Sequence, residues 1–263
     1  MASINNVEKF REKLRQGKFC IGTFIVSADP LTSELMGDLG HDFIIVDGEH
    51  APIDTSRALG HMMACRGTDC AAMIRIPWND KVMIKQYMDF HPAGIVVPFI
   101  RTAQDAADAV YAAKYPPVGM RGFGPGRGIA YGAMDAKSYL DASDTETMVI
   151  LQIEHVDAVK NIDAILDIEG IDGLMFGPND LSGSVGLLGQ PTHPDVIKMI
   201  DEVTAKVKKT KLSLGVATGY SGDLDSVQVW VDRGVNWFAL NSDYGYMQVY
   251  ARKTLEAVRK LSK

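Results

Sequence analysis

The stretch FIIVDGEHAPID, residues 43–54, is the most informative part of the sequence. Its first four residues form a short, β-branched apolar run, which is typical of a strand buried on both faces of a parallel sheet. The run ends abruptly in Asp47, Glu49 and His50. Ionisable side chains at the carboxyl end of such a strand lie where α/β folds place their chemistry. The same residues could instead cap the next helix and face solvent, so the rest of the chain has to decide.

Short apolar runs alternate with amphipathic segments from one end of the chain to the other. The expected strands are Cys20–Ile25, Phe43–Val46, Ala71–Ile76, Gly94–Pro98, Met148–Ile153, Gly173–Phe176, Leu212–Val216 and Trp237–Leu240. The helical patterns between them are Leu31–Leu39, Thr55–Arg66, Val82–Phe90, Ala103–Lys114, Ala158–Leu166, Pro194–Lys208, Leu224–Asp232 and Gly245–Leu261, with an extra N-terminal helix at Val7–Gln16.

Strands that alternate with helices imply right-handed crossovers and a parallel sheet. Eight such pairs in a chain of this length predict a closed (β/α)8 TIM barrel. A doubly wound open sheet is the alternative. It fits less well, because the eight runs are similar in length and no glycine fingerprint follows the first strand.

Size and composition narrow the class of protein. The chain has 263 residues without a break in composition, so we expect a single domain over residues 1–263. Its net charge of −6 gives no electrostatic reason to bind nucleic acid or an anionic membrane. No apolar run approaches the ~20 residues that span a bilayer, and the charged N-terminus lacks the apolar centre of a signal peptide. Three cysteines without a CxxC pair favour free thiols. We therefore expect a cytoplasmic protein.

Polar side chains recur where later strands end. Arg75 ends the third strand among apolar neighbours, and a buried guanidinium must be paired or must bind an anion. The fifth strand, in VILQIEH, delivers Gln152, Glu154 and His155. Because the carboxyl ends of parallel barrel strands meet at one mouth, we expect these side chains to lie close together.

The sixth strand ends in the turn Gly177-Pro178-Asn179-Asp180, whose backbone N–H groups could hold a carboxylate. Glu154 and Asp180 come from adjacent strands and would form an oxygen-rich site. Such a site suits Mg²⁺ or Mn²⁺ rather than zinc. The sequence therefore predicts a divalent metal ion at the barrel mouth.

The positions of the lysines favour the same chemistry. No lysine falls within or at the exit of an expected strand, and Lys211, the nearest, precedes the seventh strand. A Schiff-base mechanism needs a desolvated lysine in the mouth. We therefore expect a metal and Arg75 to activate a carbonyl group, with no Schiff-base lysine and no nucleotide cofactor.

Six motifs along nearly the whole chain resemble the HpcH/HpaI family of metal-dependent (class II) pyruvate aldolases. They are IIVDGEHAP (44–52), IRIPWND (74–80), YPPVGMRGFG (115–124), LQIEH (151–155), ILDIEGIDGLMFGPNDLS (165–182) and HPDV (193–196). The resemblance implies reversible cleavage of a 4-hydroxy-2-oxo acid to pyruvate, or to a close analogue such as hydroxypyruvate, and an aldehyde. It also implies a homo-oligomer, a hexamer built as a trimer of dimers, often with the last helix exchanged between subunits.

The resemblance also assigns roles to single residues. Glu154 and Asp180 match the family's ligands for Mg²⁺, Mn²⁺ or Co²⁺. Arg75 matches the arginine that stabilises the pyruvate enolate, and His50 with Asp47 matches the general-base dyad. The residues that match contacts to the keto-acid end are Gln152, Gly177, Pro178 and Asn179. These roles suit the chemistry, because a histidine can accept the proton of the C4 hydroxyl while an arginine stabilises the growing enolate charge.

Two features depart from this pattern. The glycine-rich run MRGFGPGRGIAYGAM, residues 120–134, predicts a mobile active-site loop. In that loop we expect Arg127 to grip a distal carboxylate of the substrate and Arg121 to be structural. His155 follows Glu154 and is expected to support the site or to cap a helix rather than to bind metal.

Other functions remain open from the sequence. The same enolate site could decarboxylate an oxaloacetate-like acid or perform an addition of the macrophomate synthase kind. A citrate-lyase-β-like enzyme that acts on a CoA thioester is less compatible with the histidine of DGEH. A non-catalytic metabolite-binding barrel would not need a base, an arginine and two metal carboxylates together.

Overall fold

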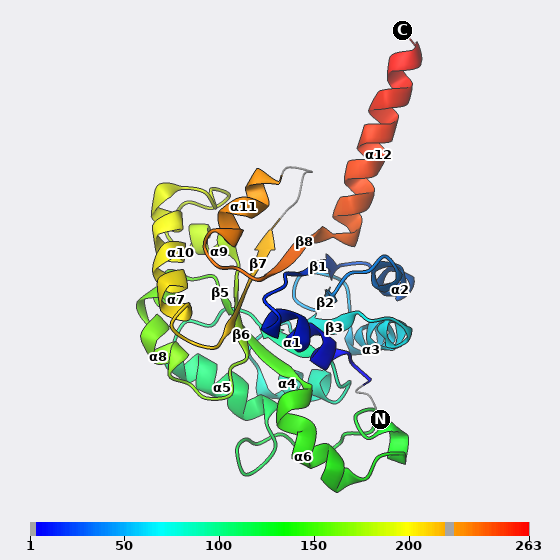
Figure 1. Cartoon of the computed structure of the whole chain (residues 1–263), viewed down its shortest axis with the longest axis vertical. Helices are drawn as coiled ribbons and strands as arrows, with labels where there is room; N and C mark the ends of the chain where they lie inside the picture. Colours follow the sequence, from blue (N-terminus) through cyan, green and yellow to red (C-terminus); the bar gives the residue numbers. More distant parts are fainter. Residues whose placement is uncertain (1–3, 219–223, 263) are drawn as a thin grey trace.

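The computed structural model describes residues 4–218 and 224–262. Eight parallel strands form a closed barrel in chain order, each paired with its neighbours and β8 with β1 (Figure 1). The strands are β1 (Cys20–Ile25), β2 (Phe43–Asp47), β3 (Ala71–Arg75), β4 (Gly94–Val97), β5 (Met148–Ile153), β6 (Gly173–Phe176), β7 (Ser213–Thr218) and β8 (Trp237–Ser242). The expected (β/α)8 barrel is confirmed.

The helices follow the strands as expected, with a few differences. They are α1 (Val7–Arg15), α2 (Leu31–Asp38), α3 (Thr55–Ala64), α4 (Lys81–Met88), α5 (Ala103–Ala113), α6 (Ala136–Glu146), α7 (Val156–Lys160), α8 (Ile162–Leu166), α9 (Pro178–Gly183), α10 (Pro194–Val207), α11 (Asp225–Val231) and α12 (Asp243–Arg259). The single helix expected at Ala158–Leu166 is two short helices, α7 and α8. The sequence did not predict α6 or the short α9.

The two apolar cores leave one mouth of the barrel for chemistry. One core lies between the strands and the surrounding helices, and the other fills the barrel interior. Helix α1 adds Val7 and Phe10 to the interior core, where Phe10 meets the rings of Phe43 and Trp237 edge-on. Because these residues lie where β2 and β8 begin, α1 closes the amino end of the barrel. The carboxyl ends of the strands form the open mouth.

The glycine-rich segment 120–134 lies at the closed end, contrary to the expectation of an active-site loop. It follows α5 and precedes β5, so it belongs to the connections that lead into strands. The Arg127 guanidinium is buried and donates to the carbonyls of Met62 (2.9 Å), Phe90 (2.8 Å) and His91 (3.2 Å). These contacts occupy the side chain that was expected to grip a distal carboxylate, so that role is wrong and Arg127 is structural.

Arg121 has the structural role that was expected for it. Its Nη2 donates to the Met88 carbonyl at 2.8 Å and pairs with Asp89 Oδ1 at 3.0 Å. The guanidinium also lies over the ring of Tyr115, 4.5 Å from its centroid. Both arginines of the segment therefore fasten it to the turn that ends α4 and leads into β4.

Helix α12 projects away from the barrel (Figure 1). Only its first residue, Asp243, is buried, and its carboxylate accepts the backbone N–H groups of Val26 and Ser27, each at 3.1 Å. Large apolar side chains farther along the helix are exposed, namely Tyr244, Met247, Val249, Tyr250, Leu255 and Val258. Across the described residues, no helix has both the length and the apolar character that crossing a bilayer requires.

Candidate active site

Asp47 and Arg75 form the buried centre of the open mouth. They are register partners on β2 and β3, and strand alternation points both side chains the same way. Arg75 Nε donates to Asp47 Oδ1 at 3.0 Å and Nη2 to Oδ2 at 2.7 Å, a bidentate pair. Burial opposes the charged form of Arg75, but the hydrogen bond and the negative charge of Asp47 outweigh it and raise the pKa of Arg75. The guanidinium therefore remains a fixed positive charge.

The expected pairing of Asp47 with the His50 imidazole is not formed. The Asp47 carboxylate accepts the backbone N–H of Glu49 (3.0 Å) and of His50 (3.2 Å), and Arg75 takes its remaining hydrogen-bonding capacity. The His50 side chain is 64% exposed, and its Nε2 lies 3.8 Å from Glu49 Oε2. Asp47 thus orients Arg75 and the turn after β2, and His50 stands at the mouth with its imidazole open to solvent.

Glu49 also belongs to the site, although its place in the sequence indicated no particular role. Its carboxylate is largely buried and lies 3.1 Å from Arg75 Nη1, although Glu49 Oε2 lacks a donor with hydrogen-bond geometry. Burial raises the pKa of Glu49 to about 7, and the charges of Asp47 and Asp180 add to the rise while Arg75 opposes it. Its position in DGEH, at the same strand exit as Asp47 and His50, was the available signal.

Glu154 leaves the end of β5 and points into the mouth. It is 2% exposed, its Oε1 accepts the Phe99 N–H at 2.8 Å, and its Oε2 accepts the Gln152 side-chain amide. Burial raises the pKa of Glu154 to about 7, helped by the negative charges of Glu49 and Asp180. Glu49, Glu154 and Asp180 are therefore close enough for their charges to interact.

Gly177 makes room for this cluster. A Cβ at position 177 would lie 2.5 Å from Glu154 Oε2 and 2.9 Å from Gln152 Nε2, so only glycine allows the end of β6 to approach so closely. Pro178 then begins α9, in whose first turn Asn179 and Asp180 are exposed. The N–H groups of a helix's first turn have no acceptor within the helix and are available to an anion.

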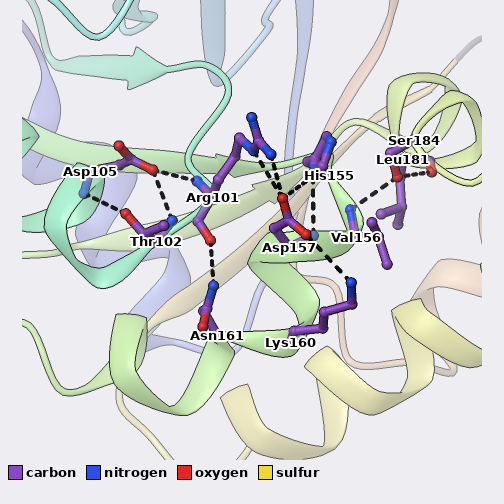
Figure 2. Close-up of polar contacts among 10 residues, drawn as sticks. All are labelled: Arg101, Thr102, Asp105, His155, Val156, Asp157, Lys160, Asn161, Leu181 and Ser184. Carbon is purple, nitrogen blue, oxygen red and sulfur yellow. Dashed lines mark hydrogen bonds and ion pairs between the residues drawn. The ribbon is translucent and has the colours of Figure 1, made fainter.

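A set of polar contacts fastens the ends of β4, β5 and β6 to one another (Figure 2). Ser184, just after α9, accepts the Val156 N–H at 3.0 Å and donates to the Leu181 carbonyl at 2.7 Å. His155 is the N-cap of α7, because its Nδ1 accepts the Asp157 N–H at 3.1 Å. The helix that carries Asp180 is therefore tied to the chain directly after Glu154, and His155 has the capping role that was expected.

A cavity of about 290 Å³ opens at the mouth beside these groups. Its lining comes from β1, β2, α9, β7 and β8 and consists of Phe24, Val26, Asp47, Asn179, Ala217, Thr218, Ala239, Asn241 and Ser242. The cavity reaches from the Asp47–Arg75 pair to the turn that begins α9. It has room for a small organic acid and a short second fragment.

The side chains of the mouth fit a divalent cation. Glu154 and Asp180 offer hard carboxylate oxygens, and the buried Gln152 Oε1 has no hydrogen-bond donor. Burial is the main cause of the raised pKa values of Glu49 and Glu154, and the charges of neighbouring carboxylates add to it, which a bound cation would offset. In the described part of the chain, no three His, Cys, Asp or Glu side chains form a ready-made metal cluster. The fit therefore rests on the Glu154–Asp180 pair.

Known proteins share this fold and much of this sequence. A family model described as HpcH/HpaI aldolase/citrate lyase matches residues 20–246. The 5-keto-4-deoxy-D-glucarate aldolase of Salmonella paratyphi C (strain RKS4594) is 34% identical over 253 residues, which are 96% of this chain and 97% of the relative. The hydroxypyruvate/pyruvate aldolase of Roseobacter denitrificans (strain ATCC 33942 / OCh 114) is 34% identical over 89% of this chain and 90% of its own.

The same similarity extends to experimental structures. The crystal structure of an HpcH/HpaI aldolase from Desulfitobacterium hafniense DCB-2 superposes with a TM-score of 0.88 at 28% identity, covering 95% of this chain and 96% of that one. The family model spans most of the barrel, and the aldolases match along nearly their full lengths. The chain therefore belongs to the HpcH/HpaI aldolase/citrate lyase family and is a carbon–carbon lyase.

Proposed function

We propose that this protein catalyses the metal-dependent, reversible aldol cleavage of a 4-hydroxy-2-oxo acid to an aldehyde and pyruvate, or a close analogue such as hydroxypyruvate. The observation that carries the proposal is the buried Arg75, held bidentately by Asp47 beside the carboxylates of Glu49 and Glu154. A fixed cation in such surroundings suits a reaction that builds negative charge on an oxygen. The names of the two aldolase relatives support the same reaction class.

In this proposal Glu154 and Asp180 hold the divalent cation, which when bound would polarise the C2 carbonyl of the substrate. Gln152 and the first turn of α9, at Gly177, Pro178 and Asn179, bind the keto-acid end.

The protein's own groups account for the bond cleavage. His50 accepts the proton of the C4 hydroxyl, and the C4–O bond becomes the aldehyde carbonyl as the C3–C4 bond breaks. The electron pair of that bond forms the pyruvate enolate, whose C2 oxygen carries charge that Arg75 stabilises. Asp47 keeps the guanidinium in place throughout. Transfer of that proton from His50 to C3 of the enolate then gives pyruvate and restores His50 as the base.

We also propose that the active form is a homo-oligomer, a hexamer built as a trimer of dimers, in which α12 packs on a partner subunit. The exposed apolar side chains of α12 support this, because a helix this exposed does not bury its own apolar surface. The three cysteines are unpaired and buried, which suits a reducing compartment such as the cytoplasm.

Product identification tests the proposed reaction. Wild-type protein supplied with Mg²⁺ or Mn²⁺ should join pyruvate or hydroxypyruvate to short aldehydes and should cleave the purified adducts. His50→Ala should slow this cleavage by roughly 10²–10⁴-fold, the usual contribution of a positioned general base, with little change in KM for pyruvate.

Decarboxylation of an oxaloacetate-like acid has no C4 hydroxyl to deprotonate. A protein that decarboxylates such an acid but forms no adduct with any aldehyde would contradict the aldolase assignment.

A further inference from the structure

Phe99 holds an unfavourable backbone conformation next to Glu154. Its φ of 53° lies in the left-handed region, which glycine adopts readily and bulky residues such as phenylalanine rarely adopt. In this conformation the Phe99 N–H donates to Glu154 Oε1 at 2.8 Å. A strained residue persists only where its surroundings hold it in place. The segment that follows β4 should therefore carry contacts that maintain this turn.

The residues after Phe99 are fixed on two sides (Figure 2). On one side, Asp105 Oδ2 accepts the backbone N–H of Arg101 (3.0 Å) and of Thr102 (2.8 Å), and Thr102 Oγ1 accepts the Asp105 N–H (3.1 Å). This is a capping box that begins α5. On the other side, Asn161 Nδ2 donates to the Arg101 carbonyl at 3.0 Å. The backbone of residue 101 is thus tied to α5 and to the end of α7.

The Arg101 side chain completes a closed ring of contacts. Its Nε donates to Asp157 Oδ2 at 3.2 Å, and its Nη2 donates to the same oxygen. Asp157 in turn donates its N–H to His155 Nδ1, and its Oδ2 lies 3.3 Å from that nitrogen. His155 follows Glu154 directly in the chain. The ends of β4 and β5 are therefore linked twice, once by Phe99 and Glu154 in the mouth and once by Arg101 and Asp157 on the rim.

We propose that Arg101 and Asp157 are positioning residues for Glu154: their ion pair holds the Phe99 N–H against Glu154 Oε1 and so fixes the direction of this carboxylate. This inference rests on the proposed role of Glu154 in holding a divalent cation. Neither residue lines the cavity at the mouth. Groups that orient a metal ligand commonly change metal affinity by about 10–100-fold when they are removed.

A role confined to stability does not match the exposure of the pair. The Arg101 side chain is 51% exposed and that of Asp157 31%, and exposed ion pairs contribute little to folding. Loss of the pair should therefore change the global stability only slightly. Its effect should instead appear in the binding of a cation at Glu154.

The experiment titrates metal-free protein with Mn²⁺ alone and records the melting temperature of each metal-free variant. Arg101→Ala and Asp157→Asn should each raise the Mn²⁺ dissociation constant by about tenfold or more. The double variant should match the worse single variant, because both changes break the same link. Arg101→Lys keeps a charge but loses the planar, two-nitrogen contact, so we expect it to restore part of the affinity. The melting temperatures of all four should stay close to that of the wild type.

A matched control is available elsewhere in the chain. Arg233 Nε donates to Asp201 Oδ1 at 2.7 Å, linking the end of α11 to α10 away from the mouth. Arg233→Ala should leave the Mn²⁺ dissociation constant unchanged. If the Mn²⁺ dissociation constants of Arg101→Ala and Asp157→Asn stay within twofold of the wild-type value, the positioning role is overturned. Wild-type Mn²⁺ binding that survives in Glu154→Gln would instead contradict the proposed metal site, and with it this inference.

Discussion

Asp47 and Arg75 show how much of this site follows from single residues in register. Both end apolar strands, and β2 and β3 pair so that the two positions are partners. Their ion pair was foreseeable in kind, because a buried arginine needs an anion. The effect of this ion pair on His50 was not foreseeable, since the sequence does not say whether the Asp47 carboxylate pairs with Arg75 or with the His50 imidazole. Packing decided it in favour of Arg75, which fits both carboxylate oxygens at once.

Arg127 gives a prediction at the same scale. Its guanidinium donates to three backbone carbonyls at the closed end of the barrel. Arg127→Ala would leave these carbonyls without donors, so we expect the free energy of unfolding to fall by on the order of 3 kcal/mol. The ratio of kcat/KM for acceptors with and without a distal anion should not change, as steady-state kinetics on the folded fraction would show. A selective loss for anionic acceptors at unchanged stability would speak against the structural role.

The residues of the site were predictable from the sequence in different degrees. Glu154 was expected as a mouth residue from its place after β5, and the structure puts its carboxylate there. The role of Glu49 in the site depends on the burial of its carboxylate. The sequence does not show this burial, because a glutamate beside a histidine in a turn can point in several directions. Arg127 was misplaced for a topological reason. A segment that follows a helix and precedes a strand lies at the amino end of the barrel, whatever its composition.

At the scale of elements, the strands were predictable and some helices were not. All eight strands lie where their apolar runs predict, and their ends differ by at most two residues, as β7 and β8 show. Helix α6 was missed because, among its described side chains, Tyr139 is buried whereas Leu140 is exposed, so its sequence shows little amphipathic pattern. The start of α6 is marked by a local signal, because the carboxylate of Asp135, the N-cap residue, accepts the Ser138 N–H. Caps of this kind are weak evidence without an apolar stripe.

The packing of α2 on α3 predicts a dependence of stability on pH. His61 on α3 is fully buried, with Nδ1 2.7 Å from Ser33 Oγ on α2. Burial lowers the pKa of His61 below its ordinary 6.5, although the charges of Asp243 and Asp29 oppose the shift. The unfolded chain therefore binds this proton at a higher pH than the folded chain does. The contribution to stability is complete above about pH 6.5 and declines as the pH falls from there toward the folded pKa.

Urea unfolding between pH 5 and pH 8 measures this effect. The wild type should lose stability below about pH 6.5 more steeply than His61→Gln, by at most about 1.4 kcal/mol per pH unit for one group. The comparison uses the difference in slope, so a general loss of stability in the variant does not obscure it. Parallel curves for the two proteins would show that His61 is not the titrating group.

At the scale of the whole molecule, α12 has no counterpart to pack on within its own chain. The apolar pattern predicted the helix but not its direction, because its apolar side chains look like those of any helix that covers a barrel; the family resemblance alone implied a last helix exchanged between subunits. We expect wild-type protein to sediment as an oligomer, and Tyr250→Lys combined with Leu255→Glu to shift it to smaller species. Asp243, which anchors the start of the helix, stays intact in this variant. A monomeric wild type in sedimentation velocity would contradict the proposed assembly.

The most direct test of the central claim is the exchange of the C3 protons of pyruvate in D₂O, followed by proton NMR. The proposed site forms the enolate of pyruvate without any aldehyde, so wild-type protein with Mg²⁺ should exchange these protons. Exchange should stop after chelation, return when Mg²⁺ is restored, and be absent in Glu154→Gln with Mg²⁺ present. Exchange at the full rate in chelated protein, together with borohydride trapping of pyruvate on a lysine, would contradict the account.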